Sequence, residues 1–181
     1  TFFLLRSRWN YLQLPELPSD PRPPERLDLA VVIPARNEES RIARVVQSLS
    51  RARVYVVDDA SSDGTALRAR QAGAAVIPAP PLPSAFAGKP HACWHGARAT
   101  DSKWLLFADA DTWYEPAFLR SLVSFAESRE LDMASVFLRQ ECVGFAEKAI
   151  LPYAFALYFC GVDGRAVNRV SADEAPANGQ C

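Results

Sequence analysis

Two carboxylates, Asp109 and Asp111, follow directly after the apolar run 104–108 and are well placed to do chemistry. An unpaired carboxylate at the exit of a buried strand is unfavourable unless a cation or a hydrogen-bonding ligand compensates its charge. Hard divalent cations such as Mg²⁺ and Mn²⁺ prefer such oxygen ligands and often share them with substrate phosphates. An Asp-x-Asp pair also occurs in ordinary turns, so its meaning depends on the elements around it.

Composition favours one globular domain with a good core, because 49% of the 181 residues are hydrophobic and 23% are charged. The formal net charge of −1 creates no field that would attract nucleic acid, so we expect no nucleic-acid partner. The four cysteines match no zinc-binding spacing and predict reduced thiols rather than a disulfide framework. Prolines cluster at 15–24 and 78–90, where we expect a linker and a long loop.

Short apolar runs of strand length alternate with segments of helical periodicity along most of the chain. This alternation predicts an α/β fold with a mostly parallel sheet, right-handed crossovers and flanking helices. Ligands of such sheets bind outside the carboxyl ends of the strands. The predicted strands are 29–33, 54–57, 74–77, 104–108 and 133–138, and the predicted helices are one beginning near Ile42 and those at 66–72, 91–100 and 115–129.

Residues 1–28 are predicted to form a membrane-proximal stub and a proline-rich linker. The apolar residues 1–5 precede Arg6, Arg8 and Trp9, an order typical of the cytoplasmic end of a transmembrane helix. A span needs about 20 residues, so this hypothesis treats the start of that helix as missing. An amphipathic N-terminal turn is the alternative.

Residues 142–181 are predicted to begin a different region, which we expect to be the start of an acceptor-binding part that the chain does not complete. The aromatic-rich stretch 142–162, interrupted by Pro152, favours a helix lying in a membrane interface. Packing against a further part of the protein is the alternative. The predicted location is therefore the cytoplasmic face of a membrane, with the membrane surface as a partner.

Four segments, taken in order, resemble the motifs of family 2 glycosyltransferases of the GT-A fold. A membrane-associated subgroup, which includes hopanoid- and carotenoid-associated transferases, is the most similar. The resemblance implies a GT-A, Rossmann-like core at 29–141, truncated at its C-terminal side. It also implies a nucleotide-diphosphate sugar as donor, Mg²⁺ or Mn²⁺, a lipid or membrane-embedded acceptor, and inverting transfer. The four segments are 31–39, 56–65, 88–92 and 105–112.

The resemblance implies roles for the polar residues at the strand exits. Asp59 would accept a hydrogen bond from the base, and Glu38 would hold ribose hydroxyls or, alternatively, face a helix dipole. Lys89 would give a point charge to the diphosphate. Asp111 would be the direct metal ligand, with Asp109 contacting the metal or the ribose. The predicted nucleotide-sugar site consists of Pro34, Arg36, Glu38, Asp58, Asp59, Lys89, Asp109 and Ala110.

Other residues receive no catalytic role. His91 and His95 have the i, i+4 spacing of a zinc pair, but no third ligand is apparent in the sequence nearby, which favours a solvated or core-edge role. No catalytic base is assigned, because the late carboxylates fit no pattern for one. We therefore expect the chain alone to bind donor but to transfer sugar poorly. These late carboxylates are Glu141, Asp163, Asp173 and Glu174.

Two alternatives to a glycosyltransferase remain. A nucleotidyltransferase also combines a nucleotide fold with metal-binding carboxylates, but residues 35–39 lack the glycine-rich loop usual after its first strand. A non-catalytic nucleotide-sugar-binding module is the other alternative, against which the intact Asp59, Asp109 and Asp111 argue.

Overall fold

The structure is a computed structural model that describes residues 2–18, 27–83 and 87–162. It divides into two compact units. The sheet unit comprises the described residues from 18 to 136, and the helical unit comprises residues 2–17 together with 137–162. The predicted division at 28/29 and 141/142 does not anticipate that the two ends of the described chain join in one unit.

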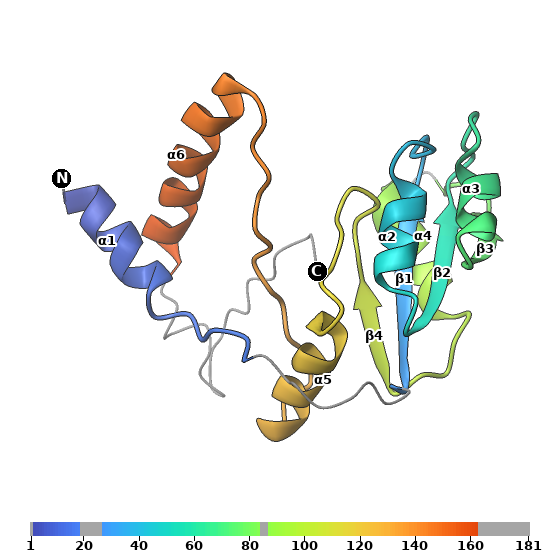
Figure 1. The fold of residues 1–181 in the computed structure, drawn as a ribbon, viewed down its shortest axis with the longest axis horizontal. Coiled ribbons are helices and arrows are strands. Elements are labelled where there is room, and N and C mark those ends of the chain that lie inside the picture. Colours follow the sequence, from blue (N-terminus) through green and yellow to red (C-terminus); the bar gives the residue numbers. More distant parts are fainter. Residues whose placement is uncertain (1, 19–26, 84–86, 163–181) are drawn as a thin grey trace. The chain divides into compact units, whose positions relative to one another are not determined.

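The sheet unit is built on four parallel strands in the order β3-β2-β1-β4, whose carboxyl ends lie at one edge (Figure 1). In register, Val31 of β1 lies opposite Val54 on one side and Leu106 on the other. The predicted parallel α/β sheet with flanking helices is confirmed. Its strands are β1 (Leu29–Ala35), β2 (Arg53–Asp58), β3 (Ala75–Pro78) and β4 (Trp104–Phe107).

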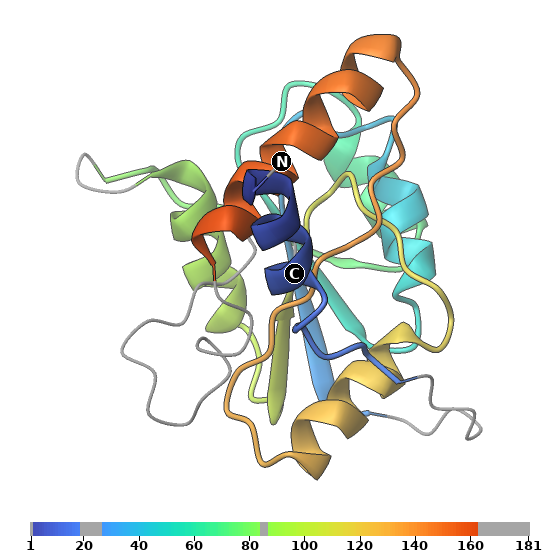
Figure 2. The same cartoon turned by 90° about the vertical axis from the view of Figure 1, so that its left-hand side faces the viewer.

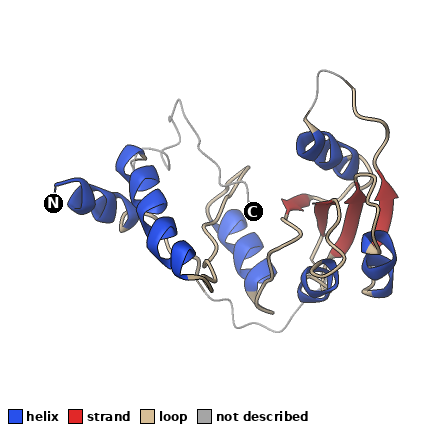
Figure 3. Ribbon diagram, turned by 90° about the horizontal axis from the view of Figure 1, so that it is seen from above, coloured by secondary structure: helices blue, strands red, loops and turns tan. Residues whose placement is uncertain are grey.

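Helices lie on both faces of the sheet, with α2 and α4 on opposite sides (Figures 1 and 3). All four predicted helices of this unit are present, with shifted ends. The helix predicted at 91–100 begins earlier because Pro90 is tolerated in a first turn, where a helix does not use its N–H. Gly73 follows α3 with φ 104°, the left-handed conformation that glycine allows. These helices are α2 (Ile42–Ser48), α3 (Thr65–Gln71), α4 (Gly88–Ala97) and α5 (Phe118–Ser128).

Helix α4 packs directly on the two central strands. The buried side chains Val32, Val57 and Ala92 form a cluster between α4 and the sheet. Gly96 faces Val32 and Val57 so closely that an added Cβ would lie 2.2 Å from Val32 Cγ1 and 2.9 Å from Val57 Cγ2. This close approach fixes the position of α4, and with it the N-terminal turn that carries Lys89.

Helix α5 is attached to the amino end of β4 by polar contacts. The Glu127 carboxylate accepts hydrogen bonds from Lys103 Nζ at 2.6 Å and from Trp104 Nε1 at 3.3 Å. The Lys103 bond lowers the pKa of Glu127, and the Trp104 bond adds to this effect.

The fifth strand predicted at 133–138 is wrong, because the structure has no strand there. The chain turns sharply after α5, where Glu130 has φ 54° and Leu131 N–H donates to Ala126 O at 2.9 Å. The boundary between the two units falls at 136/137, within the predicted strand. Apolar β-formers such as Val136 and Phe137 do not make a strand without a neighbouring edge to pair with.

The helical unit pairs α1 (Phe2–Tyr11) with α6 (Phe145–Gly161), which lie side by side in Figures 1 and 2. Asn10 Nδ2 donates to Phe159 O at 2.8 Å in a buried contact, and the ring of Tyr11 meets that of Phe159 at 5.2 Å. Helix α6 continues through Pro152. No helix within the described ranges has the length and apolar character needed to cross a membrane. Residues 19–26 of the predicted linker and the carboxylates Asp163, Asp173 and Glu174 lie outside the described residues.

The contact at Gly96 generates a prediction about stability. Gly96→Ala should lower the free energy of unfolding by about 1–3 kcal/mol, because the new methyl group overpacks the cluster around Val32 and Val57. Urea unfolding would measure the change. Gly161→Ala is the matched control, since an added Cβ there meets nothing within 4 Å. Equal unfolding midpoints for Gly96→Ala and the unsubstituted chain would contradict the packing described.

Candidate functional site

The candidate site lies at the carboxyl edge of the sheet, where the loops after β1, β2 and β4 begin. Backbone hydrogen bonds extend the pairing past the strand ends. Asp59 N–H donates to Ala35 O at 2.9 Å, and Ala108 N–H donates to Val32 O at 3.1 Å. The parallel register therefore brings the predicted polar residues of these loops to one edge, although they are far apart in sequence.

The loop after β1 is braced against the loop after β2 by side chains. Glu39 N–H donates to Asp63 Oδ2 at 3.2 Å, and Gly64 N–H donates to Glu39 Oε2 at 3.0 Å. Glu38 N–H donates to Thr65 Oγ1 at 2.7 Å. Asp63 also accepts from the hydroxyl and the N–H of Thr65, the turn and cap chemistry expected for it. Each loop therefore supplies partners for the other's backbone.

Asn37 continues this bracing. Its N–H donates to Ser61 Oγ at 3.0 Å, and its Oδ1 accepts from Ser62 N–H at 2.8 Å. Its φ of 56° is left-handed, a conformation that asparagine tolerates better than most residues. The sequence interpretation missed Asn37, Ser61 and Glu39, although the turn-rich run 61–65 was a signal that the loop is specifically structured.

Asp59 lies between the first loop and the start of α4. Arg36 Nη1 is 3.6 Å from Asp59 Oδ2 in an ion pair. On the other side, a Cβ added to Gly88 would lie 3.1 Å from the same oxygen. A residue other than glycine would crowd this carboxylate, so Gly88 allows the helix start to approach Asp59.

Lys89 forms an ion pair with Asp109, which joins the start of α4 to the Asp-x-Asp segment. The pair is partly open to solvent, since the Lys89 side chain is 54% exposed and that of Asp109 is 23% exposed. Cys93 lies one helical turn after Lys89. Burial raises the pKa of the Cys93 thiol, the Lys89 charge opposes this rise, and the Asp109 carboxylate adds to it.

The Asp-x-Asp segment is a turn closed by Thr112. Thr112 Oγ1 donates to Asp109 O at 2.8 Å and contacts Tyr114 Oη at 3.0 Å. Ala110 is buried and Asp111 is exposed. The turn therefore holds Ala110 inward while Asp111 remains accessible to a ligand.

The acidic groups of the edge partly fit a divalent cation. Among the described residues, no three His, Cys, Asp or Glu side chains gather as a metal site. Asp109 and Asp111 alone are an incomplete ligand set, which suits a cation that keeps waters and takes its remaining oxygens from phosphates. A buried oxygen at the end of β2, Asp58 Oδ1, has no hydrogen-bond partner among the described residues. Such an atom is costly to bury and is a candidate acceptor for a ligand.

The remaining predicted residues occupy distinct places. Pro34 lies in β1 opposite Val57, and the Glu38 carboxylate pairs with Arg41 at 3.8 Å. Asp58 and Asp59 are consecutive at the end of a strand, so their side chains lie toward opposite faces of the sheet. The geometry pairs Arg36 with Asp59 and Lys89 with Asp109, and Gly88, next to Lys89 in sequence, approaches Asp59. Their roles toward a nucleotide stay predictions.

His91 and His95 do form a close pair, with their Nε2 atoms 3.2 Å apart. His91 is buried, at 5% exposure, on the side of α4 toward the core. No third metal ligand stands near them in the described part of the chain. The core-edge interpretation therefore suits His91 better than a zinc site does.

The bracing by Asp63 generates a prediction about pH. The hydrogen bond from Thr65 holds the pKa of Asp63 below its usual 3.8. A lowered pKa in the folded state stabilises the fold above the unfolded value, and this stabilisation is lost as pH falls through the folded pKa. Asp63→Asn should therefore unfold at lower urea concentration at neutral pH, with the difference shrinking below pH 3.8. A difference that stayed constant on acidification would contradict this role, and Asp132→Asn, an exposed aspartate, is the control.

Comparison with known proteins identifies relatives. A 4,4'-diaponeurosporenoate glycosyltransferase of Staphylococcus haemolyticus (strain JCSC1435) is 43% identical over 89 residues, which are 46% of this chain and 24% of the relative. The protein of the same description from Staphylococcus aureus (strain MRSA252) is 38% identical over 88 residues, with the same shares. The matched part thus spans about a quarter of these relatives' length.

Solved structures also resemble this chain. Glucosyl-3-phosphoglycerate synthase of Mycobacterium tuberculosis is 32% identical with a TM-score of 0.47, over 53% of this chain and 39% of that one. Its complex with Mg²⁺ and uridine-diphosphate is 34% identical with a TM-score of 0.47, over 53% and 38%. Both TM-scores are too low to support the transfer of any residue's role.

The family model described as glycosyl transferase family 2 matches residues 30–160. The predicted resemblance to carotenoid-associated members of this family is confirmed by the relatives, and the nucleotidyltransferase alternative gains no support. Because the match reaches every strand of the sheet and all three polar loops of its carboxyl edge, the chain belongs to glycosyl transferase family 2.

Proposed function

We propose that the carboxyl edge of the sheet binds a nucleotide-diphosphate sugar together with Mg²⁺ or Mn²⁺, for transfer of the sugar to a lipid acceptor. The observation that carries this proposal is the ion pair of Lys89 with Asp109. It joins a phosphate-binding type of side chain, at the start of a helix, to a carboxylate of the Asp-x-Asp turn.

The diphosphate is held at the start of α4. Lys89 supplies a positive charge there, and the helix N-terminus favours an anion. Arg36, with a 66% exposed side chain, supplies a second charge from the adjacent loop. Asp111 and Asp109 would hold the cation, which when bound neutralises charge on the diphosphate leaving group.

The nucleoside is held by the carboxylates of the first two loops. Asp59 accepts a hydrogen bond from an N–H of the base, and Glu38 accepts from ribose hydroxyls. The bracing of these loops by Asp63 and Asn37 reduces the entropy lost when the ligand binds.

The acceptor is proposed to be a lipid at the cytoplasmic face of a membrane. The relatives are described as acting on 4,4'-diaponeurosporenoate, and the helical unit of this chain exposes large apolar side chains. In α6 these include Phe145 at 88% and Ile150 at 64% exposure. An apolar helix with aromatic side chains suits the interface of a bilayer.

Transfer is proposed to invert the anomeric carbon, with the acceptor hydroxyl attacking as the diphosphate leaves. This step needs a base within hydrogen-bond reach of that hydroxyl. No described carboxylate is assigned this role, and the function proposed for these residues is donor binding.

Removing Asp111 tests the cation site. Asp111→Ala should weaken Mn²⁺-dependent binding of nucleoside diphosphate by more than about tenfold, since loss of even an outer-shell partner of a metal costs that much. Calorimetric titration with UDP and GDP, each with and without Mn²⁺, measures the effect. Asp132→Ala, an exposed aspartate after α5, is the control. Unchanged Mn²⁺-dependent affinity in Asp111→Ala would refute the assignment.

Removing the charge of Lys89 tests the diphosphate site. Lys89→Met should lower affinity for the nucleoside diphosphate about tenfold, the effect of one hydrogen bond to a charged group, and leave affinity for the nucleoside unchanged. Lys103→Met is the control, because Lys103 pairs with Glu127 at the amino end of β4. Equal losses of affinity for the nucleoside and for the nucleoside diphosphate would show that Lys89 does not bind the diphosphate.

The same titrations separate the alternatives. Preference for a nucleoside triphosphate over a nucleotide sugar would favour a nucleotidyltransferase. Binding of nucleotide sugar without any dependence on Mn²⁺ would favour a non-catalytic module.

A further inference from the structure

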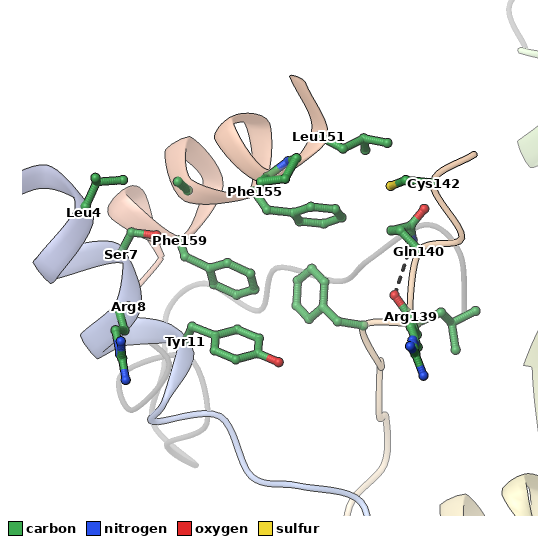
Figure 4. Close-up of a pocket in the computed structure, with 14 residues that line it drawn as sticks. Leu4, Ser7, Arg8, Tyr11, Arg139, Gln140, Cys142, Leu151, Phe155 and Phe159 are labelled. Atoms are coloured by element: carbon green, nitrogen blue, oxygen red, sulfur yellow. Dashed lines mark hydrogen bonds between the residues drawn. The ribbon is translucent and has the colours of Figure 1, made fainter. Parts of the chain in front are cut away.

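A cavity of about 810 Å³ lies within the helical unit, between α1, α6 and the segment 137–142. Figure 4 shows the rings of Phe155 and Phe159 pointing from α6 toward the segment that carries Arg139 and Gln140. All residues lining the cavity belong to this one unit. Its volume is in the range of pockets that bury a small-molecule ligand.

The wall of the cavity is mainly apolar and includes the aromatic side chains Tyr11, Phe137, Phe155 and Phe159. The ring of Phe159 meets Phe137 at 5.0 Å and Tyr11 at 5.2 Å, so rings from α1, α6 and the segment 137–142 meet in one cluster. Phe159 is buried, whereas Phe137 is 36% exposed beside the open space. Apolar surface left in contact with water in this way is stabilised when an apolar ligand covers it.

Two cations line the same cavity. Arg8 comes from α1 and Arg139 from the segment 137–142, and both guanidinium groups lie toward the lower edge of the view in Figure 4. In the ranges that the structure describes, neither makes an ion pair with a carboxylate. Gln140, between them and Cys142 in the lining, donates from its Nε2 to Leu138 O at 3.3 Å.

We infer that this cavity binds an amphipathic lipid, whose apolar chain lies on the apolar wall and whose anionic head, a phosphate or a carboxylate, lies at the edge of the cavity that carries Arg8 on one side and Arg139 on the other. Guanidinium groups bind both kinds of head through charged, often bidentate hydrogen bonds. A neutral lipid would give Arg8 and Arg139 no anion to pair with. A free phosphate would leave the apolar wall of the cavity exposed to water. That this lipid is the sugar acceptor rests on the proposed function. That the cavity binds such a lipid does not.

Three ligands that share a farnesyl chain and differ in their head groups test the inference. They are farnesyl phosphate, farnesoate and farnesol, each used below its critical micelle concentration. Calorimetric titration of the full chain should show an anionic ligand binding about tenfold or more tightly than farnesol. Arg139→Gln and Arg8→Gln should each reduce that preference. Arg6→Gln, two residues from Arg8 on the same helix and outside the cavity lining, is the matched control.

A second pair of variants tests the cavity itself. Ala156→Phe puts a ring into the cavity and should weaken all three ligands, whereas Leu157→Phe, beside it but outside the lining, should not. Equal affinity for farnesol and both anions, or affinities indifferent to Arg8, Arg139 and Ala156, would overturn the inference. Circular dichroism of each variant shows whether it folds. Binding of UDP with Mn²⁺ by the same samples reports on the proposed function, so either can fail while the other stands.

Discussion

The position of β1 is the constraint on which the sheet unit depends. This strand pairs with β2 on one edge and β4 on the other, and residues 30–33 have no exposed surface. Because side chains alternate along a strand, a slip of one residue in either pairing would turn Asp59 or Asp109 away from its present neighbours. Val32 and Val57 both face Gly96 of α4 closely, so a slip between β1 and β2 would put a different side chain into this contact. The polar edge is thus positioned by apolar packing below it.

The ion pairs at the carboxyl edge of the sheet contribute little to the stability of the fold. The side chains of Arg36 and Lys89 are more than half exposed, and exposed pairs contribute at most about 1 kcal/mol to stability. Lys89 can therefore exchange Asp109 for a phosphate oxygen at little cost, which frees the Asp109 carboxylate for another partner. The hydrogen bonds of Asp63 differ, because they join backbone groups of two loops and hold the frame within which this exchange occurs.

The sequence was sufficient for the four strands of the sheet, the helices that flank it and the family, because apolar periodicity and the order of motifs are local signals. It did not predict contacts between loops, such as that of Asn37 with Ser61 or of Gly88 with Asp59, since no periodicity encodes which side chain meets which backbone group. The strand expected at 133–138 failed for a related reason: β-propensity is local, but a strand needs an edge to pair with. The pairing of Asn10 with Phe159, across 149 residues, had no local signal.

The helical unit is held together by packing between two helices, whereas the sheet unit is held together by strand pairing. Two helices can bury one face of each against the other, and here the Asn10 contact and the rings around Phe159 do so. On α6, Tyr153 also meets Phe3 and Tyr158 meets Phe137, whereas Phe145 and Ile150 remain exposed. Exposed apolar area of this kind is unfavourable in water at about 25 cal/mol per Å², whereas in a lipid interface the same area is favourable. Under the proposed function, the exposed apolar side chains of α6 would lie at the lipid surface that holds an acceptor with an apolar chain.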